Sequence, residues 1–427
     1  MRKLSLGADT IARIDAELAA SDELLATAYP GEGAGRQPVH TVYVPADSFT
    51  TDLAARWGAE ALATVKEHGS LEQLAATLGL GQPAQLAELV RRKLESEPIE
   101  DLRLDFEDGY GNRPEDEEDA AAESVGRLVA EAVAAGTAPP FIGIRFKCFE
   151  APTRSRGLRT LDLFLGSLLE HSGARGLPAG LVLTLPKVST VAQVSAMVMA
   201  CEQLERVHGL VPGRLRFEVQ METPQLILAA DGTVPVAQLI HAGGGRVSSL
   251  HYGTYDYSAS LGIAAAYQSM EHPAADYAKS VMQVAVAGTG VHLSDGSTNI
   301  LPRGDADNVA EAWALHARLV RRHLERGLYQ GWDLHPAQLP TRFLATYAFY
   351  GEGFEAAAVR LKNYVHGIGS AILDEPATAR ALARFIHRGL ACGAVEEAEF
   401  IRLAGIGARQ LAALAHSNST PTPKDQR

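Results

Sequence analysis

The chain has 427 residues, of which 46% are hydrophobic and 21% charged, so it can bury a large core and is neither a fibrous nor a disordered protein. Its 39 Lys and Arg residues against 51 Asp and Glu give a formal net charge of -12, which argues against a general nucleic-acid grip and against a polybasic membrane patch. Its three cysteines lack metal-site spacing and no stretch is apolar enough for a membrane span, so we expect a reduced, cytoplasmic protein.

The N-terminal residues 1–38 carry an amphipathic pattern that predicts a helical segment rather than a signal peptide. After it, short apolar runs recur along the chain, with alanine- and leucine-rich helical patterns between them. Each run is 7–10 residues long, the right size for a strand. The runs are residues 39–46, 102–108, 141–147, 180–188, 215–224, 247–256, 291–297 and 330–338.

Strands that alternate with helices predict parallel β/α units. Eight units in one block predict an α/β fold, a closed (β/α)8 TIM barrel over residues 39–339. The alternative is a doubly wound open sheet, which ranks lower because no GxGxxG follows the first strand. Residues 50–100 are expected to form a helical insertion after strand 1, and residues 340–416 a C-terminal helical extension. The polar segment 417–427 is expected to be a disordered tail.

Polar residues at the C-terminal ends of the predicted strands are the candidates for an active site, because that end of a TIM barrel carries the chemistry. The second strand ends in Asp105, Glu107 and Asp108, and a period of two places the first two on one side. Such an acidic pair is costly to bury unless a cation or proton donor lies opposite. Arg145 ends the third strand, where a guanidinium suits a carboxylate, and Lys187 ends the fourth.

Two carboxylates at the ends of neighbouring strands, Glu222 and Asp256, would form an octahedral Mg²⁺ or Mn²⁺ site with waters and substrate oxygens. His335 follows the eighth strand. Each candidate also has a structural interpretation. A lone acid at a strand end is most often a helix cap, Arg145 could pair internally with Asp105, and His335 could be a structural histidine. The conjunction of such charges on successive strands favours one shared site.

Several segments of the chain resemble the HpcH/HpaI aldolase and citrate lyase β-subunit family, within the pyruvate/phosphoenolpyruvate TIM-barrel superfamily. The resemblance covers about residues 39–338, and its most specific part is GTYDYSASLG at 253–262. The other segments that carry it, in chain order, are LDFEDGY, GIRFK, LPKV, QMETP, LSDG and LHPAQ.

This resemblance implies a role for each matched residue. Glu222 and Asp256 would bind Mg²⁺ or Mn²⁺, and Arg145 would hold a substrate carboxylate or carbonyl oxygen. Backbone amides from Gly253 through Thr254 and Tyr255 to Asp256 would help to bind the substrate's carboxylate. The acids Asp105, Glu107 and Asp108 would orient metal-bound waters and the acid/base group.

Making or breaking a carbon–carbon bond next to a carbonyl passes through an enolate, which a divalent cation stabilises as a Lewis acid. We therefore expect a metal-dependent class II-type aldolase that joins or separates pyruvate, or a related 2-oxo acid, and an aldehyde. The general base could be His335, an acid at 105–108 or a metal-bound water. Lys187, a candidate for substrate binding, also leaves a Schiff-base mechanism open.

Two other functions stay open at this point. A coenzyme A thioester lyase or synthase of the citrate lyase, malyl-CoA lyase or malate synthase type would use the same metal, and Arg154, Arg156 and Arg159 could bind its phosphates. A non-catalytic binding protein that kept the barrel is the third possibility, although the costly charges of the candidate site argue against it. We expect a homo-oligomer, with the helices of 340–416 either packing across a subunit boundary or capping the barrel mouth.

Overall fold

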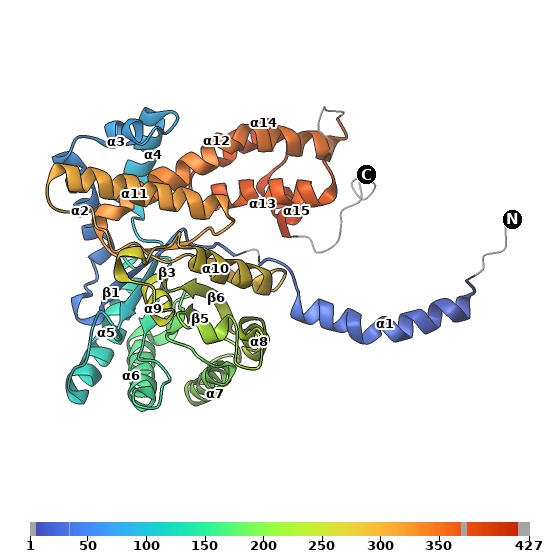
Figure 1. The fold of residues 1–427 in the computed structure, drawn as a ribbon, viewed down its shortest axis with the longest axis horizontal. Coiled ribbons are helices and arrows are strands. Elements are labelled where there is room, and N and C mark those ends of the chain that lie inside the picture. The colour runs from blue at the N-terminus through green and yellow to red at the C-terminus, as the bar shows by residue number, and fades with distance from the viewer. Residues whose placement is uncertain (1–5, 34, 369–373, 417–427) are drawn as a thin grey trace.

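The computed structural model describes residues 6–33, 35–368 and 374–416, and its strands gather in one sheet (Figure 1). The strands are β1 (His40–Pro45), β2 (Asp101–Asp105), β3 (Phe141–Arg145), β4 (Leu183–Leu185), β5 (Phe217–Met221), β6 (Val247–Tyr252), β7 (His292–Ser294) and β8 (Gly331–Asp333). They pair in parallel in the order β7-β6-β5-β4-β3-β2-β1-β8, and a bridge from Ser294 to Gln330 joins the two edges. The predicted (β/α)8 TIM barrel is confirmed.

Helices connect successive strands, and their ends follow local sequence signals. A capping box of Thr190 and Gln193 starts the helix after β4, and Gly136 ends the helix after β2 in a left-handed conformation, φ 71°. Four acids, Glu115 to Glu118, open that same helix, where negative charge suits the helix dipole. These connecting helices are α5 (Glu115–Ala135), α6 (Arg154–Ser172), α7 (Val191–His208), α8 (Pro235–Ala242), α9 (Thr254–Ser260), α10 (Pro273–Val286) and α11 (Ala306–Glu325).

The helical insertion predicted after strand 1 is present. It consists of α2 (Leu53–Glu67), α3 (Leu71–Thr77) and α4 (Pro83–Ser96). Its apolar faces join the main hydrophobic core through residues such as Trp57 and Val90, so the insertion is part of the barrel's packing rather than a separate body.

The chain after β8 is helical, with α12 (Leu339–His366), α13 (Pro376–Cys392), α14 (Glu397–Ala404) and α15 (Ala408–His416). The first half of α12 is buried in the main core, and its second half joins α13, α14 and α15 in a hydrophobic cluster of their own. The helical extension therefore grows out of a helix that packs on the barrel. The predicted tail, residues 417–427, lies outside the described residues.

At the other end of the chain, α1 (Ala8–Ala28) projects away from the barrel and buries none of its residues (Figure 1). Among the described residues, no helix combines the length and the apolar character needed to cross a bilayer. The three cysteines, Cys148, Cys201 and Cys392, are all unpaired and buried.

The interior of the barrel is polar, and its buried charges are paired. Arg103 on β2 forms ion pairs with Asp101 and with Glu218 of β5, the latter at 2.7 Å between Nη2 and Oε2. Glu218 also accepts a 2.6 Å hydrogen bond from Thr184 and lies 3.1 Å from Nε2 of His251. Burial opposes the ionisation of Glu218, but Arg103 and His251 hold its pKa well below the usual range. This network fills the barrel beneath the C-terminal ends of the strands.

Candidate active site

Arg145 and Asp105 form a buried, bidentate ion pair at the ends of two neighbouring strands. Nε and Nη2 of Arg145 donate to the two oxygens of Asp105 at 2.7 and 2.6 Å. The backbone amides of Glu107 and Gly109 donate to the same carboxylate at 2.9 and 2.7 Å. Asp105 is therefore occupied on both oxygens, and its effect is to orient the guanidinium of Arg145.

Glu107, Asp108 and Lys187 form a second charged group beside this pair. Nζ of Lys187 lies 2.7 Å from Glu107 and 2.7 Å from Asp108, and Nη1 of Arg145 lies 3.6 Å from Glu107. Burial raises the pKa of Glu107 to about 6 against the opposing charge of Arg145. The carboxylates raise the pKa of Lys187 above its usual value although burial opposes them, so this amine stays charged.

Glu222, which follows β5, is a buried carboxylate with few compensating charges. Its Oε2 accepts a 3.0 Å hydrogen bond from the backbone amide of Lys187. Burial raises the pKa of Glu222 to about 8; the charges of Asp256 and Glu107 raise it too, and Arg145 opposes them. A carboxylate in this position needs additional positive charge before it ionises at neutral pH.

The surroundings of Glu222 fit a hard divalent cation. Asp256 lies in the first turn of α9, is exposed, and is close enough for its charge to raise the pKa of Glu222. A Cβ at Gly253 would lie 2.3 Å from Cγ of Glu222, so the glycine makes room for this side chain. In the part of the chain that the structure describes, no three His, Cys, Asp or Glu side chains form a metal-binding group. Two carboxylates completed by waters and substrate suit Mg²⁺, which keeps several waters.

The segment 253–255 is anchored mainly to the loop after β7. The amide of Gly253 donates to the carbonyl of Met221 at 3.1 Å, which extends the strand pairing and takes this amide away from a substrate. The hydroxyl of Thr254 donates to the carbonyl of Ser297 at 3.1 Å, and the hydroxyl of Tyr255 accepts from the amide of Asn299 at 2.6 Å. Substrate binding by the remaining amides of this turn stays a prediction.

His335 stands apart from this cluster. Its Nδ1 accepts a 3.1 Å hydrogen bond from the amide of Ala337 and so caps the short helix Pro336–Gln338. Burial lowers its pKa, and the charges that act on it belong to Arg303 and Glu60. The structure therefore gives His335 the capping role that was the structural alternative, and no described contact joins it to Glu222 or Arg145.

Two further residues, Tyr43 and Gln220, belong to the cluster and were not among the predicted site residues. The Arg145 guanidinium lies 4.8 Å from the centre of the Tyr43 ring, and its Nη1 is 3.4 Å from Oε1 of Gln220. Gln220 in turn donates to the Tyr43 hydroxyl at 3.2 Å. The alternation of side chains offered a signal for Gln220, which lies two residues before Glu222 and therefore shares its face.

Comparison of the sequence with family models decides which protein family the chain belongs to. A model described as a domain of unknown function, DUF6986, matches residues 18–419. The chain belongs to the DUF6986 family. The match spans the barrel of this DUF6986 chain together with its helical insertion and C-terminal helices. No curated protein matches the sequence.

Solved structures relate the DUF6986 chain to proteins of known fold. A citrate lyase from Burkholderia xenovorans LB400 is 18% identical, with a TM-score of 0.55, over 90% of this chain and 100% of its own. Protein CitE from Mycobacterium tuberculosis, solved with magnesium, acetoacetate and coenzyme A, is 16% identical with a TM-score of 0.45 over 88% and 100%. An HpcH/HpaI aldolase/citrate lyase family protein from Burkholderia cenocepacia J2315 is 16% identical with a TM-score of 0.38 over 75% and 93%. The first likeness shows a shared fold.

Proposed function

We propose that this chain is a divalent-metal-dependent carbon–carbon lyase of the class II aldolase type that acts on pyruvate or a related 2-oxo acid. The observation that carries the proposal is the burial of Glu222 beside Asp256, close to the guanidinium of Arg145. A buried carboxylate whose pKa is raised by burial and by the charge of a second carboxylate is a poor structural element, but it is a suitable cation ligand.

The two carboxylates, Glu222 and Asp256, would hold Mg²⁺ or Mn²⁺. The cation would supply Lewis-acid stabilisation of the negative charge that develops on a carbonyl oxygen. Oxygen ligands at the end of a barrel strand suit these two metals better than zinc, which prefers histidine and cysteine.

Arg145 would bind the substrate with the part of its guanidinium that Asp105 leaves uncovered. Nε and Nη2 are used in the bidentate pair, whereas Nη1 makes only longer contacts, of 3.4 Å to Gln220 and 3.6 Å to Glu107. This nitrogen can donate to a carboxylate or carbonyl oxygen of the 2-oxo acid. Because the ion pair holds the guanidinium in place, substrate binding would not have to order it.

Glu107 is the best-placed residue to move a proton in this site. Both oxygens of Asp105 are engaged in hydrogen bonds, and the lowered pKa of half-exposed Asp108 makes that residue unsuited to accept a proton near neutral pH. The pKa of Glu107 near 6 matches that task. A Schiff-base mechanism at Lys187 is disfavoured, because its raised pKa keeps the amine protonated and non-nucleophilic.

The proposal is tested with Glu222→Gln and Asp256→Asn. The wild-type chain should bind Mn²⁺ and turn over pyruvate with small aldehydes in the absence of any thioester. Both variants should lose at least about tenfold in Mn²⁺ affinity and about 100-fold in turnover, because each removes a charged ligand. Glu170→Gln, an exposed acid on α6, is the matched control and should behave as wild type. Wild-type affinity and turnover in the Glu222 variant would refute the proposal.

The coenzyme A thioester alternative receives less support from the arginines at 154–159. Arg156 and Arg159 both form ion pairs with Asp119, and Nη2 of Arg159 lies 2.6 Å from Oδ2 of that residue. Nε of Arg154 donates to the carbonyl of Phe149 at 3.1 Å. These contacts compete with phosphate binding. Turnover with thioesters alone would nevertheless identify the alternative in the assay described above.

We also propose a cytoplasmic homo-oligomer. The three unpaired thiols support a reducing compartment. The helix α1 exposes Ile11, Ile14 and Leu18 and has no buried residue within the described chain, which supports a partner for its apolar face. Light scattering coupled to size-exclusion chromatography should give a mass of at least two chains, and a monomer would contradict this part of the proposal.

A further inference from the structure

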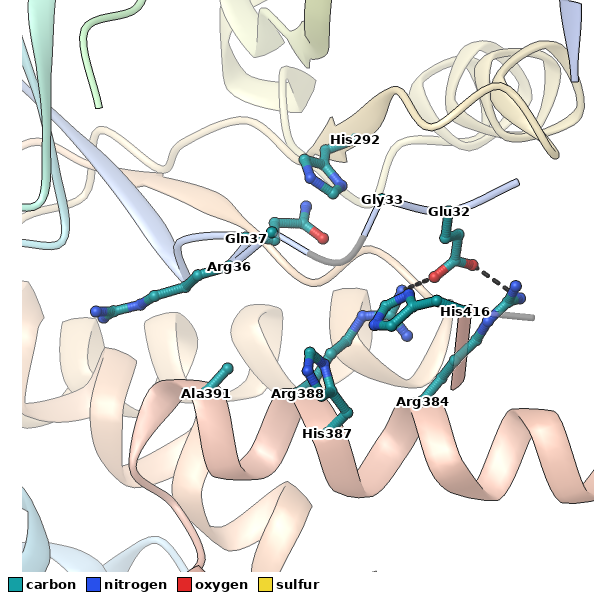
Figure 2. A pocket seen from close by; sticks show the side chains of 11 residues that line it. Glu32, Gly33, Arg36, Gln37, His292, Arg384, His387, Arg388, Ala391 and His416 are labelled. Atoms are coloured by element: carbon teal, nitrogen blue, oxygen red, sulfur yellow. Dashed lines mark hydrogen bonds and ion pairs between the residues drawn. The ribbon is translucent and has the colours of Figure 1, made fainter. Parts of the chain in front are cut away.

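A cavity lies at the opposite end of the barrel from the candidate active site. It is lined by His292, the first residue of β7, by Tyr329 just before β8, and by residues of α13. Its volume is about 540 Å³, within the range of pockets that hold small molecules. A smaller chamber adjoins it and shares the lining residues His292, Arg384 and Arg388 (Figure 2).

Three arginines on one face of α13 give this cavity a positive charge. Arg380, Arg384 and Arg388 follow one another at intervals of four residues, so their side chains lie along one side of the helix. The only carboxylate that lines the cavity in the described residues is Glu32, which lies between Arg384 and Arg388 at 3.0 and 2.7 Å (Figure 2). Three guanidinium groups against one carboxylate leave two positive charges uncompensated.

One of the three arginines, Arg380, also lacks a hydrogen-bond acceptor for its Nε within the described chain. Nε of Arg380 is buried and has no partner among the described residues. An unsatisfied buried donor is unfavourable, and an acceptor oxygen of a ligand would remove this cost. Arg388 lies 4.1 Å from the centre of the Tyr329 ring, a cation–π contact that holds this guanidinium in the cavity wall.

The pKa values around the cavity reflect the same excess of positive charge. Burial lowers the pKa of Arg384, and Arg388 and Arg380 add to this effect while Glu32 opposes it. Burial and the charge of Arg388 lower the pKa of His292 to about 4. The charged forms of Arg384 and His292 are thus disfavoured by burial and by the neighbouring arginines.

The position of Glu32 suggests how the cavity opens to an anion. Glu32 belongs to the segment between α1 and β1, which is attached through a 2.7 Å hydrogen bond from the amide of Gly31 to the carbonyl of Gly288. Its side chain reaches the arginines from a segment that is itself neither strand nor helix, so it can turn away without disturbing the barrel. An anion with more charge than one carboxylate would compete successfully for the same guanidinium groups.

We propose that this cavity binds a small molecule that carries a phosphate or diphosphate group, held by Arg380, Arg384 and Arg388 in place of Glu32. Guanidinium groups match phosphate oxygens through paired hydrogen bonds, and two or more negative charges would balance the excess. The site is distinct from the candidate active site and does not depend on the proposed lyase activity.

The test is isothermal titration calorimetry of the full chain with inorganic pyrophosphate as the probe, in buffer with EDTA so that no divalent cation is bound. We expect saturable binding to one site. Arg384→Gln should weaken the affinity by about tenfold or more, since it removes a charge-assisted hydrogen bond. Glu32→Gln should strengthen it severalfold, since it removes the competing carboxylate. The opposite signs distinguish the proposal from general damage to the fold.

Two control variants keep charge effects apart from site effects. Arg127→Gln removes an exposed arginine on α5 that pairs with Glu131, and Lys187→Gln removes a cation at the active-site end. Both should bind pyrophosphate as wild type does. ADP should displace the probe and adenosine should not. No binding to wild type, wild-type affinity in both cavity variants, weaker binding in Glu32→Gln, or displacement by adenosine would overturn the proposal.

Discussion

Neighbouring residues at the end of β3 have different surroundings, which separates site from scaffold. Arg145 uses Nε and Nη2 in its pair with Asp105, whereas its Nη1 makes longer contacts, such as that of 3.4 Å to Oε1 of Gln220. Lys147, two residues later, is buried among the carbonyls of Phe106 and Gly111, at 2.8 and 3.2 Å, and the carboxylate of Glu118. All three N–H donors of Lys147 are used, so this side chain is not free for a substrate. Instead, it ties the segment that follows β3 to the loop between β2 and α5.

Glu107→Gln tests the proposed proton carrier. The amide keeps the shape of the side chain but cannot accept a proton, so kcat should fall by about 10²–10⁴-fold. The pKa of Glu107 is raised to about 6, so its carboxylate becomes protonated, and can no longer act as a base, as the pH falls through 6. The wild-type kcat/KM should therefore decline below about pH 6, and the variant's residual activity should lack this limb. An unchanged pH profile in the variant would exclude the role, and Glu170→Gln, at an exposed acid on α6, serves as the control.

Gly253→Ala tests the space beside Glu222. The new Cβ would lie 2.3 Å from Cγ of Glu222 and 2.8 Å from its Oε1, so the carboxylate must move. We expect a loss of Mn²⁺ affinity of at least about tenfold, and a free energy of unfolding lower by roughly 1–3 kcal/mol. Gly351→Ala on α12, where a Cβ meets open space, should leave both quantities near their wild-type values. Calorimetry and urea unfolding measure them, and normal Mn²⁺ binding would contradict the steric argument.

At the scale of elements, the contact between α5 and α6 depends on one glycine. A Cβ at Gly126 would lie 2.6 Å from the carbonyl oxygen of Phe164 and 2.8 Å from the amide nitrogen of Leu168. The two helices therefore approach through backbone atoms at this point. Such close packing holds β2 and β3, whose ends carry Asp105 and Arg145, at a constant separation.

Gly126→Ala should destabilise the protein although alanine favours helix. The gain in helix propensity is about 1 kcal/mol, but separating two packed backbones costs more, so we expect a net loss of roughly 1–3 kcal/mol in the free energy of unfolding. Gly166→Ala in the middle of α6, where a Cβ meets nothing, should instead gain up to about 1 kcal/mol. Urea unfolding of both variants measures the difference, and equal effects would show that the contact is unimportant.

At the scale of the whole molecule, a buried polar network closes the barrel. Asp333 of β8 lies 2.7 Å from Nδ1 of His40 on β1 and 3.0 Å from Nε2 of His316 on α11. Arg342 of α12 donates to the same carboxylate at 2.9 Å and to Nε2 of His323 at 2.8 Å. The network thus joins the first strand, β1, to the last one, β8, and to helices α11 and α12, which follow β7 and β8.

This network makes the fold sensitive to acid. Burial and the charge of Arg342 lower the pKa of His323 to about 3, whereas the unfolded chain has a value near 6.5. Between these values the unfolded state binds the proton and the folded state does not, so stability is complete above pH 6.5 and is lost as the pH falls. For His323 alone we expect a loss of about 1.4 kcal/mol between pH 7.5 and pH 5.5.

The measurement is urea unfolding at the two pH values for the wild type and for His323→Gln. The variant should lose about 1.4 kcal/mol less than the wild type over this interval. His68→Gln, a substitution of an exposed histidine, should leave the pH dependence unchanged. If His323→Gln shows the full wild-type dependence, the acid sensitivity arises elsewhere.

The sequence by itself determined the strands, their parallel order and the end of the barrel where the charged residues gather. Seven of the eight strands fall within the apolar runs and β2 begins one residue before its run, because strand length and side-chain alternation are local properties. Closure of a parallel sheet then brings Asp105, Glu107, Arg145 and Glu222 to one mouth without further information.

Only the tertiary structure decided which partner each charged group takes. It joined Asp105 to Arg145, made His335 a cap, and added Tyr43 and Gln220 to the cluster. It also brought the arginines of α13 to the N-terminal end of β7, across about ninety positions of the chain. Side-chain pairing depends on distances and directions set by packing between remote segments, and residue type and local spacing carry no record of them.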